Sequence, residues 1–417
     1  MKMRIKISND LCTVLVVLVC YVLTIASQIL NSATVRYIMY AISIVIALCL
    51  HWVTLKNHQK TILKRYPAIF IFLFIVLFIT IFTQLMYNNY LDIGSVIQPI
   101  FLVACLIIGY SIVINYGEDS GEKTLKFILT VIVFSAILGV PEYFSNSNFF
   151  FPDYGNPWQT YRVASIYGHP IKYATSLTIG FFLVIFLIKK PILKCILLAL
   201  ITFGVFTSMS RSSWIALGLS VIVLLIAVYR KKINLKKIII LLCAAIAVVL
   251  FLQTPIGINI QEVVFARFEN INNDISSIQR LGSIEYVFNQ LGEEFNPVTL
   301  LLGHGEDAAK RLMLSTQISI SDFSTTDNEY LLILYNYGLI VLVGIVALLI
   351  WCFYQFIFKY HSISKLNKCL LCIVISQCIC SFFYEITEAK ACALPLCLCI
   401  GMLLALQAPK SNYNTLS

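Results

Sequence analysis

The sequence predicts an all-α polytopic membrane protein with about twelve transmembrane helices and one large extracytoplasmic helical loop between spans nine and ten. Three observations carry this prediction. Hydrophobic residues make up 59% of the chain and charged residues 12%, which leaves too little polar surface to cover a soluble globule. Apolar windows of membrane-spanning length recur along most of the chain. A single long polar stretch, 253–328, interrupts them.

The spans follow from window length, because crossing about 30 Å of hydrocarbon takes about 20 apolar residues in a helix. The predicted windows are 11–29, 35–54, 67–86, 94–115, 125–141, 171–188, 191–208, 212–229, 236–252, 329–352, 368–386 and 391–408. The neighbouring windows 191–208 and 212–229 are also compatible with one hairpin, and 125–141 is short for a span. The first window resembles a signal peptide, but its length and the second window directly after it favour an uncleaved span.

Basic residues predict the orientation. If the N-terminus lies inside, 21 of the 30 lysines and arginines fall on the cytoplasmic side, as the positive-inside rule requires. Both termini are then cytoplasmic, and 253–328 is extracytoplasmic. The net charge of +10 is spread over short runs between apolar stretches rather than gathered in one patch, so nucleic acid is not an expected partner.

The chain accordingly divides into spans one to nine (1–252), an extracytoplasmic loop or cap (253–328), and spans ten to twelve with a cytoplasmic tail (329–417). The cap is acidic, with ten acidic against four basic residues, so an anion site there needs individual arginines in fixed geometry. Helical spacing predicts an amphipathic helix with Arg280 and Glu285 off its apolar face, which consists of Ile278, Leu281, Ile284, Val287, Phe288 and Leu291. Pro297 is expected to end this helix, and Gly303-His304-Gly305 to form a tight turn.

Neither cysteines nor carboxylates predict a metal site. All 14 cysteines lie in or beside apolar windows, and the Cys369–Cys372 pair lacks a second pair or a histidine cluster to complete a site. Packing in helices is the better interpretation. The sequence also contains no Asp-x-Asp motif. No metal and no cofactor are therefore expected.

Several outer-face features each admit two interpretations. The aromatic run from Phe149 to Trp158, followed by Tyr161-Arg162, suits either interfacial anchoring or stacking on sugar rings. His169, directly before Pro170, either satisfies local backbone at a helix start or binds a ligand. Glu385 and Glu388 either pair structurally with Lys390 or Arg211, or take part in catalysis.

Three outer-face arginines and one carboxylate suggest chemistry. The arginines are Arg162, Arg211 and Arg280, and the carboxylate is Asp327, directly before span ten. Planar guanidinium forks bind diphosphate without a metal, and a carboxylate accepts the proton of an attacking hydroxyl. The structural alternatives are an Arg211 that extends to lipid phosphate and an Asp327 that merely caps the following helix.

In their order and spacing, several motifs together resemble the O-antigen polymerase and ligase superfamily, the Wzy-type membrane glycosyltransferases. The motifs are Gly168-His169-Pro170, Ser210-Arg211 with Trp214, Arg280, Gly303-His304-Gly305, Asp327-Asn328-Glu329-Tyr330-Leu331 and Tyr337-Gly338-Leu339-Ile340.

This resemblance implies metal-independent transfer of an undecaprenyl-diphosphate-linked oligosaccharide to a sugar hydroxyl at the cytoplasmic (inner) membrane. It implies that Arg211 and Arg280 bind the diphosphate, with Arg162 as a third arginine, and that Asp327 is the base. Ligase-type members usually carry His-Asn where this chain has Asp327-Asn328, which favours a capsule, exopolysaccharide or O-antigen polymerase. The further expected substrate-binding residues are His169, Lys172, His304, Asn328 and Tyr330, and the two histidines are alternative bases.

Membrane lipid is an expected partner, together with a flippase and a chain-length regulator. The alternatives are a ligase-type or protein-glycosylating transferase, and a lipid-linked oligosaccharide flippase or transporter. Twelve spans with both termini inside suit a transporter, but the dissimilar halves and the scarcity of charges within the spans count against one.

Overall fold

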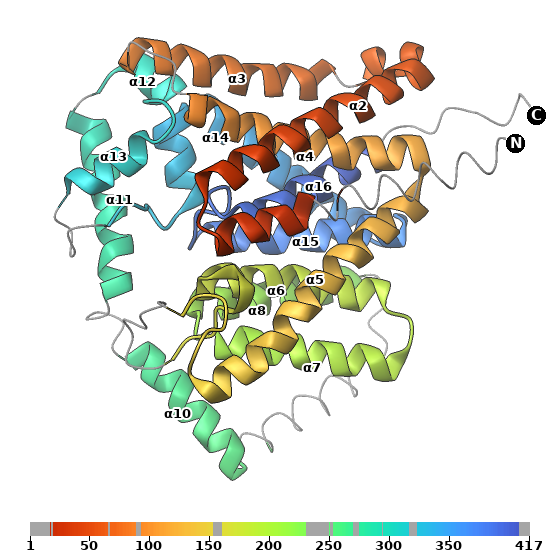
Figure 1. Cartoon of the computed structure of the whole chain (residues 1–417), viewed down its shortest axis with the longest axis vertical. Coiled ribbons are helices and arrows are strands. Elements are labelled where there is room, and N and C mark those ends of the chain that lie inside the picture. The colour runs from red at the N-terminus through yellow and green to blue at the C-terminus, as the bar shows by residue number, and fades with distance from the viewer. Residues whose placement is uncertain are drawn as a thin grey trace, which may run out of the picture.

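The computed structural model describes residues 17, 20–65, 67–88, 93–152, 161–230, 250, 253–269, 275–293, 295–316 and 323–407. Over these ranges the regular structure is helical and no strand occurs, so the predicted all-α class is confirmed. The helices that run side by side form a bundle (Figure 1). They are α2 (Ala33–Arg65), α3 (Pro67–Asn88), α4 (Ile93–Tyr116), α5 (Glu118–Ser145), α6 (Pro170–Leu187), α7 (Pro191–Thr207), α8 (Arg211–Tyr229), α14 (Glu329–Lys359), α15 (Lys365–Ser381) and α16 (Lys390–Leu406).

Six helices in the described part of the chain are long and apolar enough to cross a membrane, and four shorter apolar helices accompany them. This agrees with a multi-pass membrane protein. The count of twelve stays a prediction. The window 236–252 falls almost wholly outside the described residues, and the window 11–29 is described mainly from Cys20 to Ile29.

Two boundary questions from the sequence are answered. The windows 191–208 and 212–229 form separate helices, α7 and α8, because the chain turns at Met209 with a φ of 52° and Ser210 then caps α8. The Ser210 hydroxyl accepts a hydrogen bond from the backbone N–H of Ser213 at 3.4 Å. The short window 125–141 lies within α5, which is 28 residues long.

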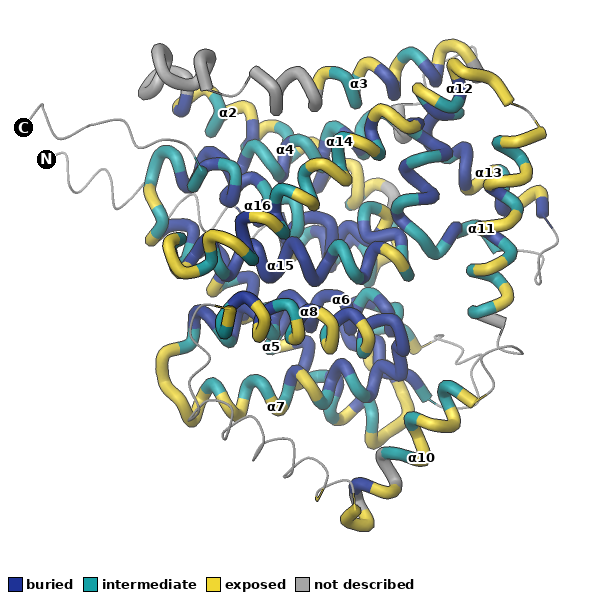
Figure 2. The backbone as a smooth tube through the Cα atoms, turned by 180° about the vertical axis from the view of Figure 1, so that it is seen from behind, coloured by how far each residue is buried: buried dark blue, intermediate teal, exposed yellow. Residues whose placement is uncertain are grey.

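The bundle core is formed by α6, α15 and α16, whose residues are mostly buried (Figure 2). Small residues let these helices approach closely. A Cβ placed on Gly401 would lie 2.0 Å from the Leu106 carbonyl oxygen, and one on Gly109 would lie 2.2 Å from that of Leu398, so only glycine fits between α4 and α16. Such contacts stabilise helix pairs where lipid tails give no hydrophobic driving force.

The polar segment forms four helices at one end of the bundle: α10 (Pro255–Glu269), α11 (Ile275–Glu293), α12 (Pro297–Leu302) and α13 (Ala308–Ser315) (Figure 1). We call them the cap. The helix predicted around Arg280 exists as α11, and it ends at Glu293, while Pro297 begins α12.

The apolar stripe of α11 is not its buried side. Leu281 is 69% exposed, and Ile278, Ile284 and Phe288 are also exposed, whereas Ser283 and Val287 are buried. Arg280 lies on the side that faces the bundle, and Glu285 is exposed. The inward face therefore carries the arginine rather than most of the apolar stripe.

A break in α14 joins the cap to the bundle. Gly338 has a φ of 77° inside this helix, which leaves the carbonyl oxygens of Tyr335 and Asn336 to accept the backbone N–H groups of His304 and Gly305, each at 2.9 Å. A side chain on Gly338 would meet the Leu301 carbonyl oxygen at 2.3 Å. The motif glycine is thus explained by backbone conformation and close approach.

Candidate functional site

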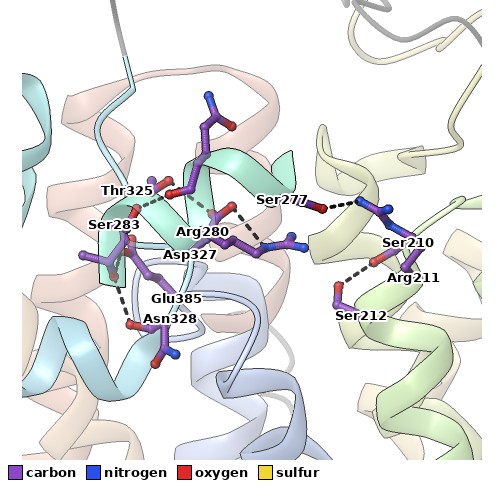
Figure 3. A network of polar contacts seen from close by, with 12 residues as sticks. Ser210, Arg211, Ser212, Ser277, Arg280, Ser283, Thr325, Asp327, Asn328 and Glu385 are labelled. Carbon is purple, nitrogen blue, oxygen red and sulfur yellow. Dashed lines mark hydrogen bonds and ion pairs between the residues drawn. The ribbon is translucent and has the colours of Figure 1, made fainter. Parts of the chain in front are cut away.

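Arg211 is the first residue of α8, and its guanidinium is directed at the cap. One terminal nitrogen donates to the Arg267 carbonyl oxygen at 2.9 Å. The other donates to the Ser277 hydroxyl at 3.3 Å (Figure 3). The residue is 8% exposed. In this structure the guanidinium of Arg211 is therefore held by groups of the cap, and the interpretation in which it extends to lipid phosphate stays untested.

Two further arginines bind the turn that precedes α8. Arg162 Nε donates to the Ser208 carbonyl oxygen at 3.1 Å, and Arg267 donates to that of Met209 at 3.3 Å. Three arginines from the loop before α6, from α8 and from α10 thus meet at residues 208–211. No sequence motif singled out Arg267, and the one available signal was its positive charge within an acidic segment.

Arg280 and Asp327 form an ion pair across the mouth of the bundle. Arg280 Nε lies 3.5 Å from Asp327 Oδ2, and the Thr325 hydroxyl donates to Asp327 Oδ1 at 3.2 Å (Figure 3). Ser277, which Arg211 contacts, precedes Arg280 by about one helical turn. Tertiary folding therefore brings Arg211, Arg280 and Asp327 into one region, although they are far apart in sequence.

The surroundings of Asp327 raise the pKa of its carboxyl group on balance. Burial raises the pKa of Asp327 above its ordinary range, and the Arg280 charge and the Thr325 hydroxyl oppose that rise. The pair keeps some contact with solvent, with side-chain exposures of 20% for Arg280 and 16% for Asp327.

Asp327 does not cap α14. The cap is Asn328, whose side-chain oxygen accepts the backbone N–H groups of Tyr330 at 2.9 Å and Leu331 at 3.2 Å. Asp327 precedes it with a left-handed φ of 48°, which is uncommon for a residue other than glycine. This backbone directs the Asp327 carboxylate to Arg280, so the capping interpretation of Asp327 is wrong.

The carboxylates between α15 and α16 have structural partners. Glu385 accepts from Thr326, and Glu388 lies 4.0 Å from the Lys390 ammonium and accepts from Gln98 at 2.6 Å. Pairing of Glu388 with Lys390 is thus confirmed.

His169 caps α6, and its Nδ1 accepts the backbone N–H of Ile171 at 3.3 Å. Its ring stacks on Tyr384, with centroids 5.9 Å apart. Burial, aided by the nearby charges of Lys172 and Arg162, lowers the pKa of His169 to about 3, so the imidazole is neutral and a weak base. The Lys172 carbonyl oxygen accepts a hydrogen bond from the Cys392 thiol at 3.5 Å. This contact joins the start of α6 to α16.

His304 and Tyr330 lie in packed positions. The His304 ring stacks on Tyr335, with centroids 4.3 Å apart, at the junction of α12 and α14. The Tyr330 hydroxyl donates to the Cys378 carbonyl oxygen at 2.9 Å, and its ring packs on Phe382. Their predicted substrate-binding roles stay predictions.

Of the aromatic loop 149–158, residues 153–158 lie outside the described residues. Tyr161, which follows the loop, donates a hydrogen bond to Glu142 at 3.0 Å.

Residues 196–346 match the family model described as O-antigen ligase. The match confirms the resemblance to the O-antigen polymerase and ligase superfamily over this range, which agrees with a membrane glycosyltransferase-like enzyme of that type. A comparison with curated proteins gave no match.

The matched range contains part of the site described above. It includes Arg211, Arg267, Arg280 and Asp327, together with the cap helices and the break in α14 at Gly338. Arg162, His169 and the loop between α15 and α16 lie outside it. The match to the O-antigen ligase model therefore covers the region of Arg211, Arg280 and Asp327 but not the start of α6.

Proposed function

We propose that this protein is a polysaccharide polymerase of the cytoplasmic membrane. It transfers an undecaprenyl-diphosphate-linked glycan to a sugar hydroxyl of a second lipid-linked repeat unit, on the outer face. The observation that carries the proposal is the partly exposed Arg280–Asp327 ion pair, with Arg211 bound to Ser277 one helical turn away on α11. Two fixed guanidinium groups next to a carboxylate suit a reaction that expels a diphosphate and consumes a hydroxyl proton.

In the proposed reaction the acceptor hydroxyl attacks the anomeric carbon of the donor glycan. Its proton passes to Asp327 as the new glycosidic C–O bond forms. The bond between the anomeric carbon and the diphosphate oxygen breaks, and the lipid diphosphate leaves with the electron pair. Arg211 and Arg280 stabilise the charge on the leaving group, a task that guanidinium forks perform without a metal ion.

The raised pKa of Asp327 supports its role as the base, because a base works best when its pKa approaches the operating pH. Neutral His169, with its pKa near 3, is a poorer candidate. His304 is also less suited, because its ring is stacked at the junction of α12 and α14.

An O-antigen ligase is the second candidate, and the description of the matching family favours it. The two candidates differ in the acceptor, which is a second lipid-linked repeat unit for a polymerase and a lipid core sugar for a ligase. Asp327-Asn328, at the place where ligase-type members usually carry His-Asn, favours the polymerase.

The test uses the purified full-length protein with an undecaprenyl-diphosphate-linked repeat unit and EDTA. We expect a ladder of lengthened products on a gel. We expect Asp327→Asn to lower the rate by roughly two to four orders of magnitude, the range typical of a lost general base. Glu285→Gln is the matched control, since Glu285 is an exposed carboxylate on α11.

Polymer of normal length and yield from a correctly inserted Asp327→Asn variant would exclude Asp327 as the base. Strict dependence on a divalent ion would contradict the arginine-only mechanism. Transfer to a lipid core acceptor, with no lengthening of the repeat unit, would favour the ligase.

A further inference from the structure

Two segments far apart in sequence exchange hydrogen bonds reciprocally beneath Asp327. The Thr326 backbone N–H and hydroxyl both donate to Glu385 Oε1, at 2.5 and 2.6 Å. In return, the Thr387 backbone N–H donates to Glu329 Oε2 at 3.0 Å, and its hydroxyl donates to Glu329 Oε1 at 2.6 Å. We call Thr326, Glu329, Glu385 and Thr387 the clasp.

The clasp is built into the protein interior. Thr326, Glu329 and Glu385 are each less than 5% exposed. A buried carboxyl group needs hydrogen-bond donors, and here each one receives a backbone N–H and a hydroxyl from the opposite segment. The loop that supplies Glu385 and Thr387 is tied in turn to α16, because the Lys390 ammonium donates to the Thr387 carbonyl oxygen at 2.7 Å.

Asp327 lies between the two anchor points. Thr326, before it, is bound to Glu385; Glu329, two residues after it, is bound to Thr387; and Asn328 is fixed as the cap of α14. An aspartate at a φ of 48° persists only where its surroundings hold it there. The clasp supplies that constraint on both sides, and the resulting backbone directs the carboxylate to Arg280.

We propose that Glu385 and Glu329 are positioning residues, which act through the clasp to hold Asp327 against Arg280. This inference rests on the proposed function, in which Asp327 is the base. Glu385 and Thr387 lie outside the range that matches the O-antigen ligase model, so the loop between α15 and α16 becomes part of the support of the active site. Neither glutamate touches the reacting atoms in this proposal.

The experiment compares apolar and amide variants of the two glutamates in the full-length protein. Glu385→Leu and Glu329→Leu remove the acceptor oxygens, whereas Glu385→Gln and Glu329→Gln keep one. We expect the leucine variants to lower kcat about 100-fold, since a misplacement of about 1 Å costs that much, with an unchanged KM for the lipid-linked donor. The glutamine variants should retain kcat within about threefold. Glu388→Leu, in the same loop but outside the clasp, is the control.

Amide hydrogen exchange at Thr326 and Thr387 provides a readout that needs no turnover. Both amides should exchange slowly in the wild-type protein and in the glutamine variants. The Thr326 amide should exchange faster in Glu385→Leu, and the Thr387 amide should exchange faster in Glu329→Leu. Wild-type activity of an Asp327→Asn variant would contradict the proposed function. The exchange rates at Thr326 and Thr387 would still show whether the clasp exists.

Two results would overturn the proposal. One is a leucine variant whose partner amide exchanges faster while kcat stays at the wild-type value, because the clasp would then not serve catalysis. The other is a leucine variant that loses activity while both amides stay protected. A leucine variant that does not insert is replaced by Thr387→Val, with Thr387→Ser as its conservative partner, and the same two criteria apply.

Discussion

Arg211 is oriented before any substrate arrives. A backbone carbonyl of α10 and a hydroxyl of α11 hold its two terminal nitrogens, so its planar group has a defined direction. Arg280 is similarly held by Asp327. Two fixed planar guanidinium groups lose little conformational freedom when they bind a diphosphate. A lysine ammonium group on its flexible side chain would lose more.

We therefore expect Arg211→Lys to behave as a severe change rather than a conservative one. The lysine keeps the charge but loses the fork, and kcat/KM for the lipid-linked donor should fall by about 10- to 100-fold. Initial rates of chain lengthening measure this. Arg311→Lys serves as the matched control, because Arg311 is an exposed cap residue on α13. Equal rates for Arg211→Lys and the wild type would show that charge alone suffices at this position.

At the scale of the helix, two features of α14 position the reaction region: its N-terminal cap and the break in its backbone. Its first turn is capped by Asn328, and its backbone breaks at Gly338 to bind the His304 and Gly305 amides. The segment between these points carries Asn336, whose side-chain oxygen accepts the Ala309 N–H at 2.8 Å and so fixes α13. One short piece of helix thus places the Asp327 carboxylate relative to the cap.

Asn328→Ala should destabilise the folded protein by about 1 kcal/mol, the usual cost of a lost helix cap. The measurement is thermal or denaturant unfolding in detergent, with Asn328→Ser as the variant that retains a capping oxygen. Asn328 is also an expected substrate-binding residue. Loss of donor affinity in Asn328→Ser, with stability retained, would support that second role, whereas an unaltered unfolding midpoint in Asn328→Ala would argue against the cap.

At the scale of the whole molecule, a buried carboxyl joins the cap to the bundle. Glu306, between α12 and α13, accepts a hydrogen bond from the Tyr337 hydroxyl on α14. Burial, together with nearby carboxylates, raises the pKa of Glu306 to about 8. An unfolded chain would release this proton near pH 4.3. Between these values the folded state binds more protons, so the free energy of unfolding falls as the pH rises.

The protein should accordingly unfold at a lower temperature at pH 8.5 than at pH 6, with the change complete once the pH exceeds about 8. Glu306→Gln should reduce this dependence, because the amide cannot titrate. The remainder should persist, because burial also raises the pKa of Glu385 to about 8. Melting curves in detergent across the pH range measure the effect. Glu293→Gln, an exposed carboxylate in the same cap, should keep the wild-type slope. A Glu306→Gln slope identical to that of the wild type would assign the pH dependence to other groups.

Sequence patterns predicted the helices of the bundle well, but predicted the packing of the cap poorly. In a membrane protein, lipid-facing and protein-facing surfaces are both apolar, so an apolar stripe does not identify the buried side. In the cap, which lies outside the predicted spans, the ion pair of Arg280 with Asp327 turns that side of α11 inward and Leu281 is exposed. Similarly, Asp327 and Asn328 are both common capping residues, and only the backbone conformation distinguishes them.

By itself the sequence determined the all-helical membrane class, the positions of most helices and the motif residues Arg211, Arg280 and Asp327, because apolar window length and motif spacing are local properties of the chain. Tertiary structure alone decided which groups meet. Arg267 joins the turn before α8, and Glu385 reaches Thr326 across 59 residues of sequence. Such pairings depend on how packed helices bring distant segments together, and no local pattern encodes that distance.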